Sequence, residues 1–150
     1  MLKKLLVVLA IFISCAPLLA GSGKAIVTRW FAADWDSKST NLQISNITGN
    51  DLEVTVTFYK QDGTLHTGSD ILFANFQASN AELGAGKTGY ITIKNSAAQP
   101  DLKYGYAVIE WKNKGSDDDV LGLVAHSYSN QNQSGRAGWY STSINGDMPF

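Results

Sequence analysis

The sequence is poor in the residues that carry covalent and metal chemistry. Its 150 residues include one cysteine, Cys15, and two histidines, His66 and His126. A single cysteine cannot form a disulfide within the chain, so the folded part depends on a hydrophobic core and a hydrogen-bonded sheet. The histidines have neither cysteine partners nor an H-x-x-x-H spacing. We therefore expect no metal centre and no cofactor.

The sequence also lacks a marked excess of positive or of negative charge. The chain has 12 basic and 13 acidic residues, a formal net charge of −1, and no stripe of lysine or arginine. A protein that binds nucleic acid or an anionic membrane surface needs such a stripe. We expect neither of them as a partner.

Motifs for catalysis are missing as well. His126 and Ser127 are adjacent, but the chain has no G-x-S-x-G elbow that would activate a serine. Glu110 is the one acid inside an apolar strand, and we expect it to pair with Arg29, Arg136 or a lysine on a neighbouring strand. Because no set of groups satisfies the geometric requirements of a reaction even in outline, the sequence predicts a protein that is not an enzyme.

Two acidic loops are candidates for a cation site. Residues 117–119 are three consecutive aspartates, and Asp34 and Asp36 flank Trp35. Calcium takes six to eight oxygen ligands, but three adjacent aspartates cannot all point at one ion. We interpret residues 117–119 as a solvated loop, with calcium binding as the alternative.

The most informative feature that is present is an export signal in residues 1–22. Lys3 and Lys4 precede an apolar run over residues 5–13, and small residues follow, with cleavage expected before Gly23. The run is too short for a membrane-spanning helix, which needs about 20 residues. We expect the protein to be secreted or at the cell surface, with the periplasm, or a lipid anchor on Cys15, as alternatives.

Residues 23–150 show the two-residue period of β-strands. Residues 52–59 alternate cleanly, and with residues 42–46 and the turn 48–51 they predict a hairpin. A second hairpin is expected from 103–112 and 120–128 through the polar loop 113–119. Both faces of 103–112 are apolar, so we expect a central strand covered on both sides.

Further strands are expected at 25–33, 88–94 and 138–144, with one short helical turn within 71–81. Many short strands with Gly, Asn and Asp turns predict a single antiparallel β-sandwich, an all-β fold.

Aromatic residues give one functional hypothesis. We expect Trp111 to fill the core, and burial of Trp30 or Trp139 beside it is the alternative to an exposed role. Exposed aromatic rings stack on sugars or anchor partners, and Trp35, Trp139 and Tyr140 are the candidates for this role.

The first strand gives the other hypothesis. It contains the apolar residues Ile26, Val27, Trp30 and Phe31 and follows a flexible Gly-Ser-Gly leader. Such a strand pairs with its own sheet or with the open edge of another copy. We therefore expect a non-enzymatic extracellular structural protein that self-associates into a fibre or matrix through this strand. The alternative is a secreted module that binds a carbohydrate, another ligand or a surface.

Residues 45–48, 54–59, 104–111 and 144–150 carry a resemblance to known proteins. Together they resemble small exported bacterial β-sandwich proteins of uncharacterised function, and the overall pattern is similar to the sensory rhodopsin transducer sandwich. The resemblance implies the sandwich fold and brings no site residues with it.

Overall fold

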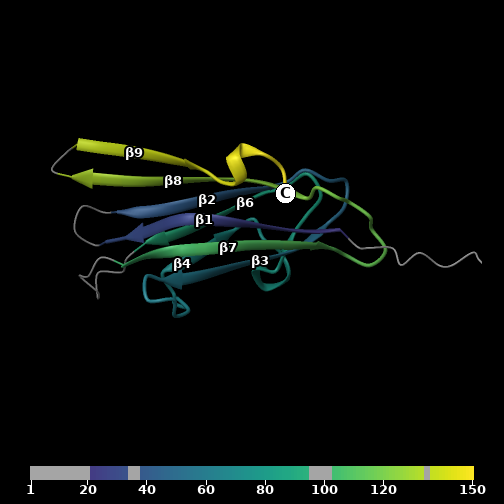
Figure 1. Cartoon of the computed structure of the whole chain (residues 1–150), viewed down its shortest axis with the longest axis horizontal. Helices are drawn as coiled ribbons and strands as arrows, with labels where there is room; N and C mark the ends of the chain where they lie inside the picture. Colours follow the sequence, from purple (N-terminus) through teal and green to yellow (C-terminus); the bar gives the residue numbers. More distant parts are fainter. Residues whose placement is uncertain (1–20, 34–37, 95–102, 134–135) are drawn as a thin grey trace, which may run out of the picture.

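The computed structural model describes residues 21–33, 38–94, 103–133 and 136–150. In these residues two antiparallel sheets pack face to face, which confirms the all-β sandwich (Figure 1). The predicted signal peptide up to residue 20, and Trp35 with its flanking aspartates, lie outside the described residues. No helix that the structure describes has the length and apolar character that a membrane crossing requires.

The smaller sheet has four strands in the order β1-β7-β3-β5. They are β1 (Ser22–Ala32), β7 (Lys103–Asn113), β3 (Leu52–Lys60) and β5 (Glu82–Leu83). The larger sheet has the order β4-β6-β2-β8-β9. Its strands are β4 (Ile71–Ala74), β6 (Thr88–Lys94), β2 (Ser39–Asn46), β8 (Leu123–Gln133) and β9 (Arg136–Ser143). Two short 3-10 turns, Ala78–Asn80 and Asn145–Asp147, complete the described elements.

Both predicted hairpins are wrong. β2 and β3 follow each other in the sequence but belong to different sheets, and so do β7 and β8. The connection between β2 and β3 crosses from one sheet to the other. Asn46 holds it there, because its buried amide donates to the carbonyls of Leu83 and Gly84 at 3.0 and 3.1 Å. The next residue, Ile47, donates its N–H to the carbonyl of Gly122. These partners are distant in the sequence, so the turn residues alone gave no sign of the crossing.

β7 is central in its sheet, but only one of its faces is covered, which corrects the prediction. Ala107, Ile109 and Trp111 point into the core, whereas Tyr104 and Tyr106 are exposed. Tyrosine suits a half-exposed pleated surface, so the face of β7 that carries these tyrosines is stable without another sheet or helix packed on it. On the same outer face Glu110 pairs with a lysine, Lys24, at 3.1 Å. The segment 71–81 forms the strand β4 and one 3-10 turn.

Two tryptophans anchor the core: Trp111, as predicted, and Trp30. Trp30 is 0% exposed, and its indole N–H lies within hydrogen-bond distance of the carbonyls of Tyr59 and Tyr106, at 3.1 and 3.0 Å. Trp111 donates to the carbonyl of Phe150 at 2.6 Å, which ties the end of the sequence to β7. A buried indole N–H without such a partner would cost free energy, so these bonds favour the buried positions.

Candidate functional site

β1 distributes the four residues of the predicted assembly strand over three environments. The strand pairs with β7 of the same chain from Ser22 opposite Lys112 to Ala32 opposite Lys103. Val27 and Trp30 point inward and are fully buried, and Ile26 lies on the outer face, 54% exposed. Phe31 lines a groove at the end of the strand.

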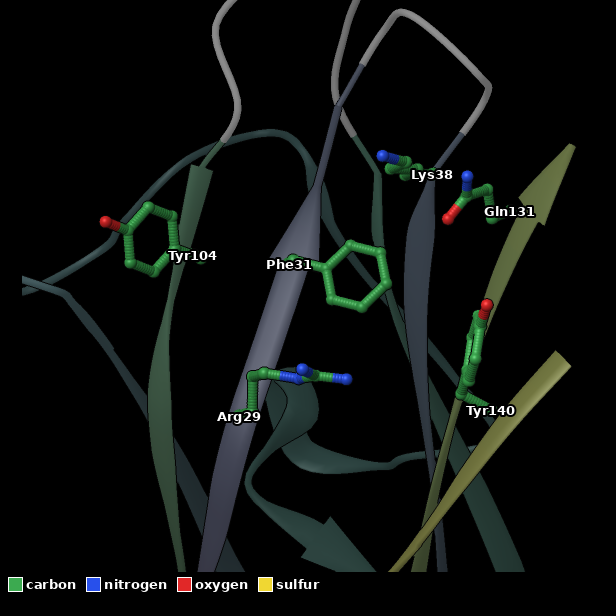
Figure 2. Close-up of a pocket in the computed structure, with 6 residues that line it drawn as sticks. All are labelled: Arg29, Phe31, Lys38, Tyr104, Gln131 and Tyr140. Carbon is green, nitrogen blue, oxygen red and sulfur yellow. The ribbon is translucent and has the colours of Figure 1, made fainter. Parts of the chain in front are cut away.

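This groove has a volume of about 520 Å³. Figure 2 shows the Phe31 ring of β1 at its centre, Tyr104 of β7 on one side and Tyr140 of β9 on the other. β1 and β9 are edge strands of opposite sheets, so the groove lies where the side of the sandwich is open. Its described lining consists of Arg29, Phe31, Lys38, Tyr104, Gln131 and Tyr140.

A β-bulge in β1 places Arg29 beside the groove. The register with β7 shifts between Val27 and Trp30, so both of these residues face the core while Thr28 and Arg29 between them are exposed. Bulges re-aim side chains in this way. The guanidinium carbon of Arg29 consequently lies 5.4 Å from the centre of the Phe31 ring, which is a cation–π geometry.

A buried threonine holds the backbone of Phe31. Thr40 of β2 accepts a hydrogen bond from the Phe31 N–H at 3.0 Å, and its hydroxyl lies 3.0 Å from the Phe31 carbonyl and 3.0 Å from the hydroxyl of Ser129. Thr40 is 0% exposed. One hydroxyl therefore links β1 of the smaller sheet to β2 and β8 of the larger sheet directly below the groove.

The two predicted stacking residues of β9 belong to different surfaces. Tyr140 lies opposite Ser129, which points inward, and its ring lines the groove. Trp139 lies opposite Asn130 and points to the outer face of the larger sheet, where its ring centre is 5.9 Å from that of Tyr128. Trp139 is 67% exposed. Neighbouring residues of a strand point to opposite faces, so the two side chains cannot share one ligand site.

The groove combines a cation with aromatic rings. Arg29 supplies positive charge, Phe31, Tyr104 and Tyr140 supply rings, and Lys38 and Gln131 complete the described lining. No carboxylate occurs among its described lining residues. Arginine binds carboxylates through two parallel hydrogen bonds, and aromatic rings stack on flat apolar faces. The lining therefore suits an anionic ligand that also presents a ring.

Sequence reasoning missed a buried polar cluster next to Trp30. The Nε2 atom of His66 lies 3.1 Å from Oδ2 of Asp70, and Nζ of Lys103 lies 3.4 Å from the same oxygen. The His66 ring also stacks on Trp30 with 4.8 Å between ring centres. His66 and Asp70 are four residues apart in a loop, where this spacing does not predict that two side chains meet. The cluster fixes the loop between β3 and β4 onto the core.

The remaining candidate residues are dispersed. His126 lies on the outer face of the larger sheet, with Nε2 2.7 Å from the Ser141 hydroxyl and Nδ1 3.7 Å from Asp147. Asp119 accepts a hydrogen bond from Asn50 at 3.1 Å. In the described ranges no three His, Cys, Asp or Glu side chains converge on a point where a metal ion would fit.

Comparisons of the chain with protein-family models, with curated proteins and with solved structures gave no significant match. The resemblance to exported β-sandwich proteins therefore stays a prediction. The function of the chain is inferred from the chemistry and geometry of its own residues.

Proposed function

We propose that the protein is a non-enzymatic binding module that acts outside the cytoplasm and binds an acidic polysaccharide in the groove between β1 and β9. The observation that carries this proposal is the grouping of the Arg29 guanidinium with the rings of Phe31, Tyr104 and Tyr140 in one groove. The carboxylate of an acidic sugar meets Arg29, and the C–H face of its ring lies on an aromatic side chain.

The groove is organised before the ligand arrives. Phe31 is fixed by the Thr40 hydroxyl through its backbone N–H. Arg29 in turn rests against the Phe31 ring, a contact that contributes about 0.5–1 kcal/mol at an exposed site. Groups that are already oriented lose less conformational entropy when they bind, which strengthens binding without new contacts.

The test is calorimetric titration of the purified protein with polygalacturonate. We expect Arg29→Ala and Tyr140→Ala each to weaken binding about tenfold, equivalent to about 1.4 kcal/mol. Added NaCl should weaken wild-type binding, because the contact is charged. The matched control is Lys24→Ala, which removes a cation from the same strand at its ion pair with Glu110, and it should bind like the wild type. Equal loss in the control and in Arg29→Ala would point to net charge and not to the groove.

A second candidate function is self-assembly through β1, and one observation favours it. β1 is the first described strand of the chain and also one of the two edge strands of its sheet. A strand in this position can be exchanged between copies, and Val27 and Trp30 of one copy then fill the core of the next with unchanged contacts.

The test for exchange is a pair of cysteines in the two strands. Ile26 and Val108 lie directly opposite each other in β1 and β7. In a Cys15→Ser background, Ile26→Cys combined with Val108→Cys should give cross-linked multimers on non-reducing gels if β1 is exchanged. Only monomers with an internal disulfide would show that β1 stays in its own sandwich.

A further inference from the structure

The two outer faces of the sandwich differ in chemistry. The smaller sheet carries two ion pairs on its outer face, Lys24 with Glu110 at 3.1 Å and Lys112 with Glu53 at 2.7 Å. The outer face of the larger sheet carries mainly serine, threonine, amide and aromatic side chains. Among the described side chains of its strands, charge occurs there only at Lys94, which lies opposite Ser39, and at His126, close to Asp147.

A hydrogen-bonded ladder orders one end of this face across three strands, in the row where Ser39 lies between Lys94 and Asn130. The hydroxyl of Ser39 and the amide Nδ2 of Asn41 both donate to Oδ1 of Asn130, at 2.8 and 2.9 Å. The hydroxyl of Thr92 donates to Oδ1 of Asn41 at 2.8 Å. The oxygen of Asn130 is thus held by two donors, which turns its Nδ2 group into an oriented donor for a bound molecule.

An aromatic platform adjoins the ladder. Trp139 lies directly opposite Asn130, and its ring is tilted by 35° against that of Tyr128. With 67% of its surface exposed, Trp139 is more accessible than a structural role requires. A large ring beside an oriented amide is the pairing that sugar recognition uses, because the ring covers the C–H face of the sugar and the amide bonds its hydroxyls.

We propose that this outer face, centred on Tyr128, Asn130 and Trp139, is a second binding surface whose ligand is a neutral polysaccharide chain. Charge complementarity selects this occupant. A nucleic acid or an acidic polymer needs a row of cations, whereas the described side chains of these strands give only two separate ones on this face, Lys94 and His126. An apolar protein surface would leave the ladder's polar groups without partners. A neutral, hydroxyl-rich chain satisfies the amides and the rings together.

The two surfaces are separate, so this inference does not depend on the groove. Trp139 and Tyr140 are neighbours in β9 and point to opposite faces. A substitution at one of them therefore leaves the other surface intact, and each binding activity can fail alone.

The test is depletion of the purified protein by microcrystalline cellulose and by insoluble chitin. We expect retention on at least one of these solids, little changed by added NaCl because hydroxyls, amides and rings make the contact. Trp139→Ala and Tyr128→Ala should each weaken retention about tenfold. The control Tyr106→Ala, which removes an exposed ring that stacks on Tyr59 on the opposite outer face, should bind like the wild type.

Titration with soluble cellohexaose or chitohexaose gives a second readout, a change in tryptophan fluorescence that Trp139→Ala abolishes. Absence of retention on both solids overturns the proposal, and so does retention that neither substitution weakens. Self-association that Trp139→Ala disrupts, without any glycan binding, would overturn it in favour of an interface between copies.

Discussion

The Thr40 hydroxyl should contribute measurably to the free energy of unfolding, because it joins the two sheets beneath the groove. Thr40→Val keeps the shape of the side chain and removes its hydrogen bonds. The N–H of Phe31 and the hydroxyl of Ser129 then lose a partner at 3.0 Å in a place where Thr40 itself is fully buried. An unsatisfied buried polar group costs about 1–3 kcal/mol. We expect a loss of this size.

The assay is urea unfolding followed by tryptophan fluorescence, with the slope of free energy against denaturant checked for constancy. Thr55→Val is the matched control, because Thr55 is exposed on β3 and the same change there should stay within about 0.5 kcal/mol. Ser129→Ala, alone and combined with Thr40→Val, should show a coupling of about 0.5–1 kcal/mol between the two hydroxyls. A loss below about 0.5 kcal/mol for Thr40→Val would refute the reasoning.

Three further changes test other parts of the fold. Gly23→Ala should cost about 1–3 kcal/mol in urea unfolding, because an added Cβ would collide with the indole nitrogen of Trp111. A variant as stable as the wild type would contradict this packing. Asp70→Asn should destabilise the loop between β3 and β4 by about 1–3 kcal/mol through its contact with buried His66, seen as faster amide exchange in residues 61–70. The pKa of Asp62 is lowered by hydrogen bonds from the hydroxyl and the backbone N–H of Thr64, so its contribution to stability is present at neutral pH and is lost as the pH falls through the folded-state pKa. An NMR titration should show that Thr64→Val raises this pKa toward the ordinary value, and an unchanged pKa would rule out the hydroxyl as the main cause.

Strand positions could be predicted because they follow from local alternation. Residues 52–59 and 88–94 were expected as strands, and β3 and β6 cover Leu52–Lys60 and Thr88–Lys94. Burial of Trp111 was also predictable, since it stands in the same register as Ala107 and Ile109. The pairing of the strands could not be predicted. The connection after Asn46 crosses to the other sheet, and the hydrogen bonds that hold it there go to residues 83, 84 and 122, which are distant in the sequence.

The sequence by itself determined the fold class, the positions of most strands and the residue types that are available for binding. The tertiary structure alone decided how those residues are grouped. The groove joins Arg29, Tyr104 and Tyr140, which are far apart in the chain, and the bulge in β1 that exposes Arg29 has no marker in the sequence. Alternation within β9 already places Trp139 and Tyr140 on opposite faces, but only the sheet pairing decided that Tyr140 is the one that lines the groove. The physical reason is that alternation is a property of each strand, whereas which side chains meet depends on long-range pairing and on the packing of the two sheets.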